Sequence, residues 1–145
     1  MRICLFILTI FISMSTSAQQ DFSKLKWKNR IIVFNTPSLS NEDFKNQWDA
    51  FMEFPKKISD RNILLFVLVK GKIYDNDLRL IQKMEVAEIR KKYQLTQSYP
   101  GFILIGKDGG VKSRKEYFID PKDVFLNIDQ MPMRQQEMKQ NIIVD

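Results

Sequence analysis

The sequence predicts an α/β fold, a four-stranded mixed sheet in the strand order 2-1-3-4 that is flanked by helices. Three observations lead to this fold class. Residues 31–34 and 63–69 are uninterrupted apolar runs, which is typical of strands buried on both faces. The segment after each run places apolar residues at helical spacing. Asp108-Gly109 then predicts a tight hairpin between two antiparallel strands.

Residues 1–18 are predicted to be a signal peptide rather than part of the fold. Arg2 supplies a positive charge, and residues 3–12 are almost wholly apolar. Thr16 and Ala18 occupy the two key positions of a small-residue cleavage site. An apolar run of about ten residues is too short for a membrane helix, which needs roughly 20. We therefore expect an exported protein, periplasmic or extracellular, with no membrane span after cleavage.

Cleavage would leave residues 19–145 as a single domain without cysteine or histidine, because the one cysteine is Cys4 and the chain has no histidine. Thiol peroxidase and disulfide-exchange activities need a reactive thiolate, so they are excluded for this mature chain. Ser-His-Asp and Cys-His sites are excluded for the same reason, and a structural zinc site is not expected. We expect no cofactor and no catalytic or metal-binding residue. The formal net charge of +6 favours anionic partners.

The first strand is expected at residues 30–35 and is followed by turn residues. Ser40 is expected to cap the next helix, with Glu42 and Asp43 in its first turn, where acidic groups suit the positive end of the helix dipole. Pro55 is expected at or just past the end of that helix. Four residues at helical spacing form its predicted apolar face: Phe44, Trp48, Phe51 and Met52.

The second strand is expected at residues 63–69, because this run is apolar on both faces, and Lys70-Gly71-Lys72 closes it. Residues 75–93 are helical in period and long enough to divide into two helices or to begin irregularly. The predicted inward positions of this region are Leu78, Ile81, Val86, Ile89 and Tyr93.

The third strand is expected at residues 102–105, followed by a hairpin turn at residues 106–110. The fourth strand, residues 111–118, is partly polar and is therefore expected near an edge of the sheet. Asp120 is expected to cap the last helix, with Pro121 at its first position. The resulting order, β-α-β-α-β-β-α, is the topology of the thioredoxin fold, and the right-handed crossover rule makes the first two strands parallel.

Two blocks of the sequence resemble a known family. Residues 104–112 (LIGKDGGVK) and 128–138 (IDQMPMRQQEM) are similar to the two hallmark blocks of the peroxiredoxin-like DUDES domain of unknown function. That domain occurs in small secreted bacterial proteins and in the sushi-repeat-containing and coiled-coil-domain-containing extracellular proteins of animals. The resemblance spans roughly residues 27–138. It implies a thioredoxin-like fold that lacks the redox cysteines, and it implies no known reaction.

The loop after the first strand is where thioredoxin-like enzymes hold their reactive thiol, at the start of the next helix. The corresponding, degenerate redox-loop positions here are Thr36, Pro37, Ser38, Leu39 and Ser40. A serine hydroxyl needs a dedicated base, and the chain has no histidine to serve as one. Ser38 and Ser40 either cap the helix or bind an anion at its N-terminus. Pro100 is a candidate cis-proline by analogy with thioredoxins.

Two groups of residues form the candidate binding surface: Lys107, Lys112, Arg114 and Lys115, and the segment residues Met131, Met133 and Arg134. The basic group either keeps an edge strand soluble or contacts anionic polysaccharide, lipid headgroups or another protein. The methionines either pack into the core, with an Arg134–Glu137 pair beside them, or form a docking surface.

The leading hypothesis is a non-catalytic, exported, thioredoxin-like module that binds a protein or an anionic envelope component. Nucleic-acid binding is not expected, because export and the lack of interleaved exposed aromatic residues disfavour it. One alternative is a carboxylate- or divalent-ion-dependent hydrolase of envelope material, which predicts a cleft with raised carboxylate pKa values. The other is a secreted chaperone-like factor with an apolar patch near Pro100. The sequence predicts no particular oligomeric state.

Overall fold

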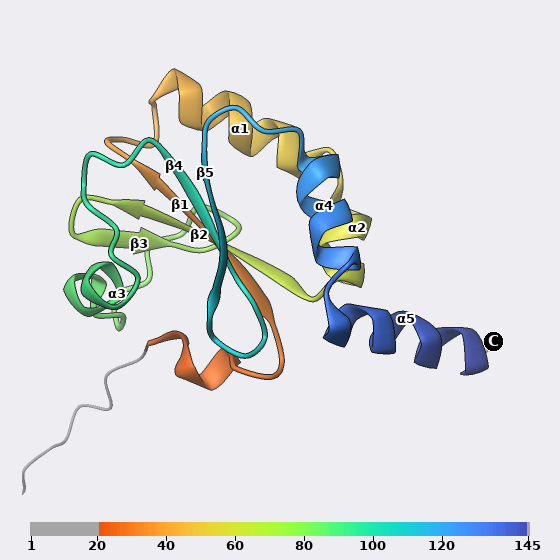
Figure 1. The fold of residues 1–145 in the computed structure, drawn as a ribbon. Coiled ribbons are helices and arrows are strands. Elements are labelled where there is room, and N and C mark those ends of the chain that lie inside the picture. The colour runs from red at the N-terminus through yellow and green to blue at the C-terminus, as the bar shows by residue number, and fades with distance from the viewer. Residues whose placement is uncertain (1–20, 145) are drawn as a thin grey trace, which may run out of the picture.

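Five strands form one mixed sheet in the order β3-β2-β1-β4-β5, as Figure 1 shows. The computed structural model describes residues 21–144. Strands β1 and β2 are parallel, and β4 runs antiparallel to β1. The edge strands, β3 and β5, are each antiparallel to their neighbour. The strand bounds are β1 Arg30–Thr36, β2 Ile63–Val69, β3 Lys72–Tyr74, β4 Gly101–Ile105 and β5 Val111–Glu116.

The four predicted strands are present in the predicted order, and β3 is an additional strand at one edge. The predicted four-stranded sheet is therefore wrong in strand number. Lys70-Gly71-Lys72 turns the chain back beside β2 instead of only closing it. Lys70 adopts a φ of 54°, the left-handed conformation that tight hairpin turns use. The predicted bounds of β2, residues 63–69, are confirmed.

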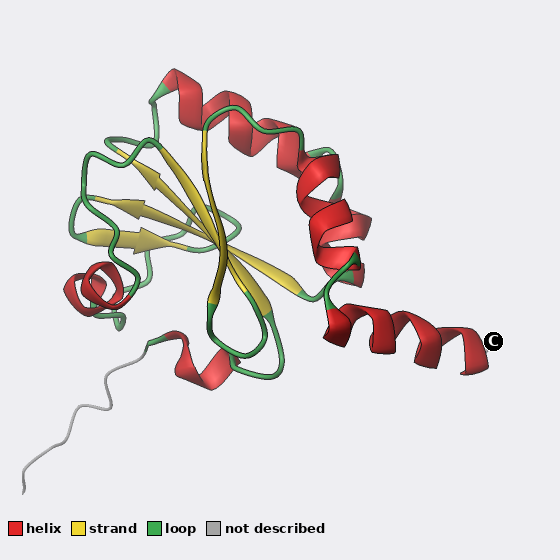
Figure 2. Cartoon of the chain, viewed as in Figure 1, coloured by secondary structure: helices red, strands yellow, loops and turns green. Residues whose placement is uncertain are grey.

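Helices cover both faces of the sheet, as Figure 2 shows in red. One face packs against α1 and α4 through a cluster that includes Phe34, Phe51 and Phe125. The opposite face packs against α3 and a short 3₁₀ turn through a cluster that includes Val33 and Ile89. The helix bounds are the 3₁₀ turn Phe22–Leu25, α1 Glu42–Met52, α2 Pro55–Asp60, α3 Val86–Lys92, α4 Pro121–Asp129 and α5 Pro132–Val144.

The cap of α1 is Asn41 rather than the predicted Ser40. The Asn41 side-chain oxygen accepts from the Phe44 N–H at 3.0 Å, which satisfies one of the free donors at the start of the helix. Pro55 does more than mark the end of this helix, because it begins a separate helix, α2. Proline is favoured at a first helical position, where its missing N–H is not needed. The prediction that Asp120 caps the helix after the fourth predicted strand is confirmed, although this helix, α4, is followed by a further helix, α5.

Only residues 86–92 of the predicted helical region 75–93 are helical. The Asp75 carboxylate accepts from the N–H groups of Asp77 and Arg79, both at 2.9 Å. These local bonds stabilise a turn in place of the first helical hydrogen bonds. The chain then passes along β3, where the Ile81 N–H donates to the Ile73 carbonyl at 2.9 Å.

The predicted signal peptide, residues 1–18, and Cys4 lie outside the described residues. Within residues 21–144, no helix has the length and apolar character needed to cross a membrane.

Candidate functional site

The candidate site is built on the turn between β4 and β5. The Gly106 N–H donates to the Gly110 carbonyl at 2.9 Å, and the Gly109 N–H donates to the Gly106 carbonyl at 3.0 Å. Gly109 has a φ of +83°, which glycine adopts without steric strain. The Asp108 carboxylate accepts from the Gly110 N–H at 3.1 Å and from the Lys112 ammonium at 2.6 Å. The predicted hairpin at residues 106–110 is therefore confirmed.

The start of α5 forms the second part of the site. The Met131 N–H donates to the Ile128 carbonyl at 2.9 Å, so the last turn of α4 runs directly into the new helix. Pro132 begins α5, and the helix then extends away from the sheet in Figure 1. Met131 is half-buried and packs against the core cluster of the α1 and α4 face.

A buried ionic network lies between the hairpin and α5. Arg30, which is 1% exposed at the start of β1, donates to both carboxylate oxygens of Glu137 at 3.1 and 3.2 Å. Lys107, on the hairpin, donates to Asn62 at 2.9 Å and forms a 2.7 Å ion pair with Glu137. Burial alone would raise the pKa of the Glu137 carboxyl, but hydrogen bonds from Arg30 and Lys107 outweigh it, so the pKa is lowered. Glu137 therefore stays ionised and ties α5 to the sheet.

The second half of the network joins α2, α4 and α5. Arg134, which is 3% exposed, donates to Asp60 and, at 3.2 Å, to Asp129. Arg61 also donates to Asp129, so this carboxylate serves two arginines. The predicted Arg134–Glu137 pair is present at 3.6 Å as one contact within this larger network.

Two of the candidate binding residues belong to this network. Lys107 and Arg134 are both buried, and each is engaged by carboxylates of the chain itself. Both side chains therefore have a structural role in the network, and Lys107 also lines the pocket described next, so their part in binding stays a prediction. A charge withdrawn from water needs compensating partners, and the fold supplies them here.

A pocket of about 300 Å³ adjoins this network, and Arg30 and Lys107 of the network are among its lining residues. Met131, Pro132 and Met133 form its apolar wall, while Asp108 and Lys112 contribute from the hairpin side. The pocket therefore brings together the two sequence blocks that carry the family resemblance. We call it the hairpin pocket.

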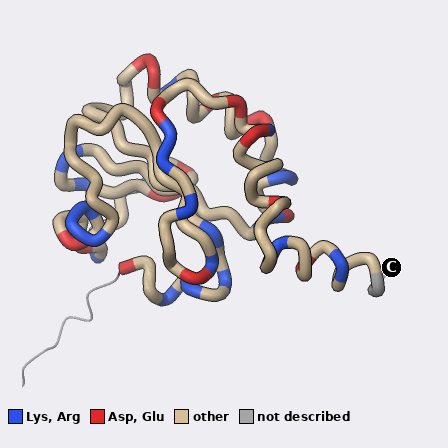
Figure 3. Tube along the Cα trace, in the orientation of Figure 1, with Lys and Arg blue, Asp and Glu red and all other residues tan. Residues whose placement is uncertain are grey.

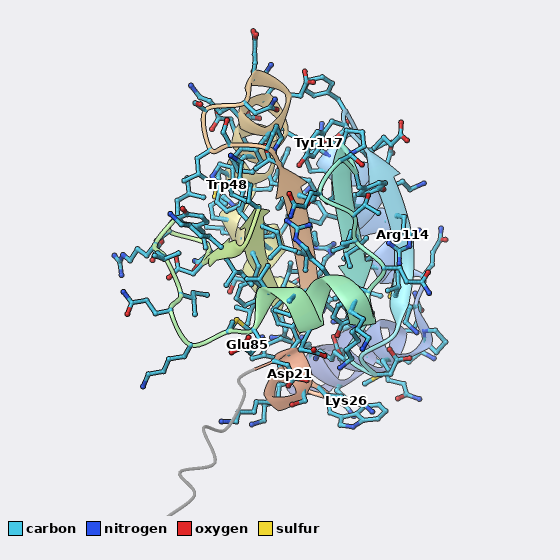
Figure 4. The ribbon with its side chains drawn as sticks, turned by 90° about the vertical axis from the view of Figure 1, so that its left-hand side faces the viewer. Asp21, Lys26, Trp48, Glu85, Arg114 and Tyr117 are labelled. Carbon is cyan, nitrogen blue, oxygen red and sulfur yellow. The ribbon has the colours of Figure 1, made fainter. Side chains whose placement is uncertain are left out.

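The basic residues of β5 do not form one cluster. Figure 3 shows blue positions along this strand, and their side chains point to different faces of the sheet. Side chains of successive strand residues point to opposite faces of a sheet. Arg114 lies opposite Ile103 and donates to the Tyr93 carbonyl at the end of α3. Figure 4 shows Arg114 on β5 at one side of the sheet. Lys115 lies opposite Phe102 and so belongs to the other face.

The degenerate redox-loop positions lie between β1 and α1. Thr36 ends β1, and its hydroxyl donates to the Ser38 carbonyl at 2.8 Å. The hydroxyls of Ser38 and Ser40 are 3.1 Å apart and bond to each other. A groove of about 660 Å³ lies at this end of the sheet. The β1–α1 loop and the β2–β3 hairpin line it, and the lining residues include Pro37, Ser38, Leu39, Ser40 and Tyr74. Nothing in this loop provides a base for a serine nucleophile.

The structure reveals a buried polar centre at Asn35, which was expected only as the last residue of the first strand. The Asn35 side-chain amide donates to the Tyr99 carbonyl at 2.6 Å, and its oxygen accepts from Arg90 at 2.7 Å. The Tyr117 hydroxyl donates to the Asn35 carbonyl at 2.9 Å, and burial raises the pKa of that hydroxyl. The signal in the sequence for this centre was a polar residue, Asn35, directly after the apolar run of the first strand.

This centre holds the segment before Pro100, and the candidate cis assignment of Pro100 is wrong. Within residues 21–144, the one cis peptide bond joins Tyr117 to Phe118. The Tyr99–Pro100 bond is thus trans, the form of lower free energy for an ordinary X–Pro bond. The Pro100 carbonyl accepts from the Tyr117 N–H at 3.1 Å, which extends the pairing of β4 with β5.

Across the described residues, no three acidic, histidine or cysteine side chains gather closely enough to hold a metal ion. The carboxylates near the hairpin pocket are instead paired with cations. Burial effects at Asp108 are outweighed by its hydrogen bond from Lys112, which lowers the pKa of that carboxyl.

Comparisons with known proteins agree with the resemblance of the two blocks. The chain is 26% identical over 119 residues to Sushi repeat-containing protein SRPX2 of Homo sapiens, covering 78% of this chain and 25% of that protein. It is 23% identical over 141 residues to Coiled-coil domain-containing protein 80 of Danio rerio, covering 84% of this chain and 16% of that protein. The chain therefore spans a quarter or less of these relatives. No solved structure gives a significant match.

The family model described as "Domain of unknown function (DUF4174)" matches residues 21–137, a range that covers both the hairpin and the first turn of α5. The first block, and all of the second except its last residue, Met138, thus fall inside the matched range. The chain belongs to the DUF4174 family.

Proposed function

We propose that this chain is an exported, non-catalytic module with a thioredoxin-like fold, and that it binds a protein partner at the hairpin pocket. The observation that carries the proposal is the meeting of the two family blocks around one apolar-walled pocket. The charged groups Lys107, Arg134 and Glu137 of the same blocks are engaged in internal pairs. The pocket is thus rigidly supported while its methionine side remains available for contact, and methionine adapts well to a binding partner.

The order and directions of four strands support the thioredoxin-like part of the proposal. Strands β2, β1, β4 and β5 follow the predicted order 2-1-3-4, with the first pair parallel and the other pairs antiparallel. The short strand β3 extends this arrangement at one edge.

The chemistry of the pocket favours binding over hydrolysis. A hydrolase that uses carboxylates predicts a general acid with a raised pKa. The pKa values of the Asp108 and Glu137 carboxyls are instead lowered, because hydrogen bonds from lysine and arginine favour the ionised forms. The chaperone alternative predicts an apolar patch near Pro100. Among the described residues of the chain segments around Pro100 and its hydrogen-bonded neighbour Tyr117, the one large apolar side chain that is exposed is Phe118.

Photo-crosslinking in the native cells tests this function. The full chain carries p-benzoylphenylalanine at Met133, and a matched variant carries it at Lys83, an exposed position in the loop beside the other edge of the sheet. We expect a discrete protein adduct from position 133 and none from position 83. Equal adduct patterns from both positions would contradict a binding site at the pocket. Hydrolysis of envelope material by the purified chain, abolished by a chelator, would contradict the non-catalytic role.

A further inference from the structure

The outer side of β5 is an unpaired strand edge. The Tyr117 N–H donates to the Pro100 carbonyl, which places Tyr117 in a hydrogen-bonded pair with β4. In an antiparallel ladder such residues alternate with residues whose N–H and carbonyl groups point away from the neighbouring strand. Arg114 and Glu116 are the outward-directed residues, and among the described residues neither forms a backbone hydrogen bond on that side.

The charge of β5 selects the kind of strand that fits this edge. Lys112, Arg114 and Lys115 against Glu116 give the strand a net charge of 3 − 1 = +2. Because Arg114 and Lys115 point to opposite faces, a neighbouring strand meets positive charge on both of its faces. Opposite charges on paired strands are stabilising, and like charges directly opposite are destabilising. A second copy of β5 would bring two strands of the same positive charge together, which disfavours self-pairing.

The hairpin pocket adjoins this edge, since Lys112 both lines the pocket and lies on β5. We propose that β5 accepts an extended, acidic segment of a partner protein as an additional strand, with one apolar side chain of that segment seated in the hairpin pocket. Main-chain hydrogen bonds to Arg114 and Glu116 supply affinity, and charge supplies selectivity. This inference rests on the proposed binding function and specifies the partner's binding segment.

The probe is a synthetic peptide of about eight residues, the length of an ordinary strand, with alternating glutamates and a leucine at one end. NMR titration of the mature chain measures its dissociation constant. We expect the amides of Arg114 and Glu116 to gain about tenfold protection from hydrogen exchange in the complex. A peptide with lysine in place of glutamate is expected to bind at least about tenfold more weakly.

Backbone N-methylation of the peptide separates strand addition from simple charge attraction. Only alternate peptide amides can face β5 in an antiparallel pair. Methylation of one alternating set is therefore expected to abolish binding, while methylation of the other set leaves it within about twofold.

Two substitutions at one position sharpen this test. Glu116→Gln removes a negative charge that repels the peptide, so it is expected to tighten binding. Glu116→Pro removes the same charge together with the outward N–H, so it is expected to weaken binding several-fold. Proline is tolerated on an edge strand where the N–H faces away from the neighbouring strand. Thermal unfolding of both variants, together with the peptide titration of Glu116→Gln, keeps the test decisive if the proline variant loses its fold.

The outcomes separate this inference from the proposed function. Binding that tolerates both methylated sets, or that dextran sulfate reproduces, overturns strand addition and indicates a general anion surface. A dimer in sedimentation experiments that Glu116→Pro dissociates indicates a second copy as the occupant and likewise overturns it. A crosslink at position 133 without peptide protection of Arg114 and Glu116 overturns only this inference. Equal adducts at positions 133 and 83 overturn the proposed function itself.

Discussion

The two edges of the sheet are completed in different ways. At β3 the following chain returns along the strand, where the Ile81 N–H donates to the Ile73 carbonyl and Leu80 forms a bridge with Tyr74. At β5 no such segment follows among the described residues, and the strand is exposed or half-buried along its whole length. Exposed strand edges invite unwanted pairing unless they are covered or charged. One edge is therefore covered by the chain, whereas the other is protected by charge and left accessible.

The covered edge is held by local bonds, whereas the open edge has a distant ion pair in addition to the local bonds of its hairpin. Asp75 organises the turn beside β3 through residues two and four positions away. The hairpin that leads into β5 is held by Lys107, whose partner Glu137 lies on α5 near the end of the described chain. Substitutions at the two edges should therefore differ in how much they lower the free energy of unfolding and in how far through the structure amide exchange increases.

The largest effect is expected from Glu137→Ala. The substitution leaves Arg30 and Lys107 buried without their shared carboxylate, and removing one partner of a buried ion pair costs about 3 kcal/mol or more. Chemical denaturation of the variant should show this loss, and amide exchange should increase at the hairpin. Lys139→Ala, an exposed position on the same helix, is the matched control and should change stability by less than about 0.5 kcal/mol. Equal effects of both variants would show that the network does not hold the open edge.

A smaller effect is expected from Gly101→Ala, which acts on the pairing of β5. An added methyl group at Gly101 would lie 2.0 Å from the Lys115 carbonyl oxygen, so the backbone of β5 must shift. Forcing atoms into such a close approach costs about 2 kcal/mol. Amide exchange measured across β4 and β5 should rise in the variant.

Gly71→Ala is the control for that substitution on the opposite edge. Nothing lies within 4 Å of the position of its added methyl group. Its effect on the free energy of unfolding should stay below about 0.5 kcal/mol. A loss at Gly71 as large as that at Gly101 would contradict the explanation by close backbone approach.

Much of this architecture was predictable because its signals are local. Residues 63–69 are apolar on both faces, and β2 has those bounds. The Asp-Gly pair gave the hairpin, and Asp120 with Pro121 gave the start of α4. β3 and the adjoining loop were missed because apolar residues at helical spacing, such as Leu78 and Ile81, also serve a loop that folds back on the sheet.

The candidate site was predictable only in part, for the same physical reason. The hairpin and the methionine segment were identified as sequence blocks, and the structure brings them together. Their charged residues were expected on the surface, because nothing near Lys107 in the sequence reveals Glu137 as its partner. Ion pairs between residues far apart in the chain depend on the final packing, which spacing does not encode.

Asp75→Ala should produce a more modest loss at the covered edge. The carboxylate of Asp75 accepts hydrogen bonds from two backbone N–H groups. Water can partly replace the carboxylate as their acceptor, so the free energy of unfolding is expected to fall by about 1 kcal/mol. Increased exchange should be confined to β3 and the segment that covers it. Asp77→Ala removes a neighbouring exposed carboxylate and should have no measurable effect. Exchange that spread to β5 would show that the two edges are coupled.

The smallest effect concerns pH, and it separates the half-buried carboxylate of Glu137 from the more exposed one of Asp108. The pKa of Glu137 is lower in the folded chain than its ordinary value of 4.5, so its ionised form stabilises the fold above that value. This contribution is lost as the pH falls below 4.5 and through the folded pKa, since protonation then releases Arg30 and Lys107. Denaturation at a series of acid pH values should therefore show a shallower loss for Glu137→Gln than for the unaltered chain. Asp108→Asn should leave the slope nearly unchanged, because solvent screens the Asp108–Lys112 pair at the open edge. An identical slope for Glu137→Gln and the unaltered chain would mean that α5 is not held to the sheet by this carboxylate.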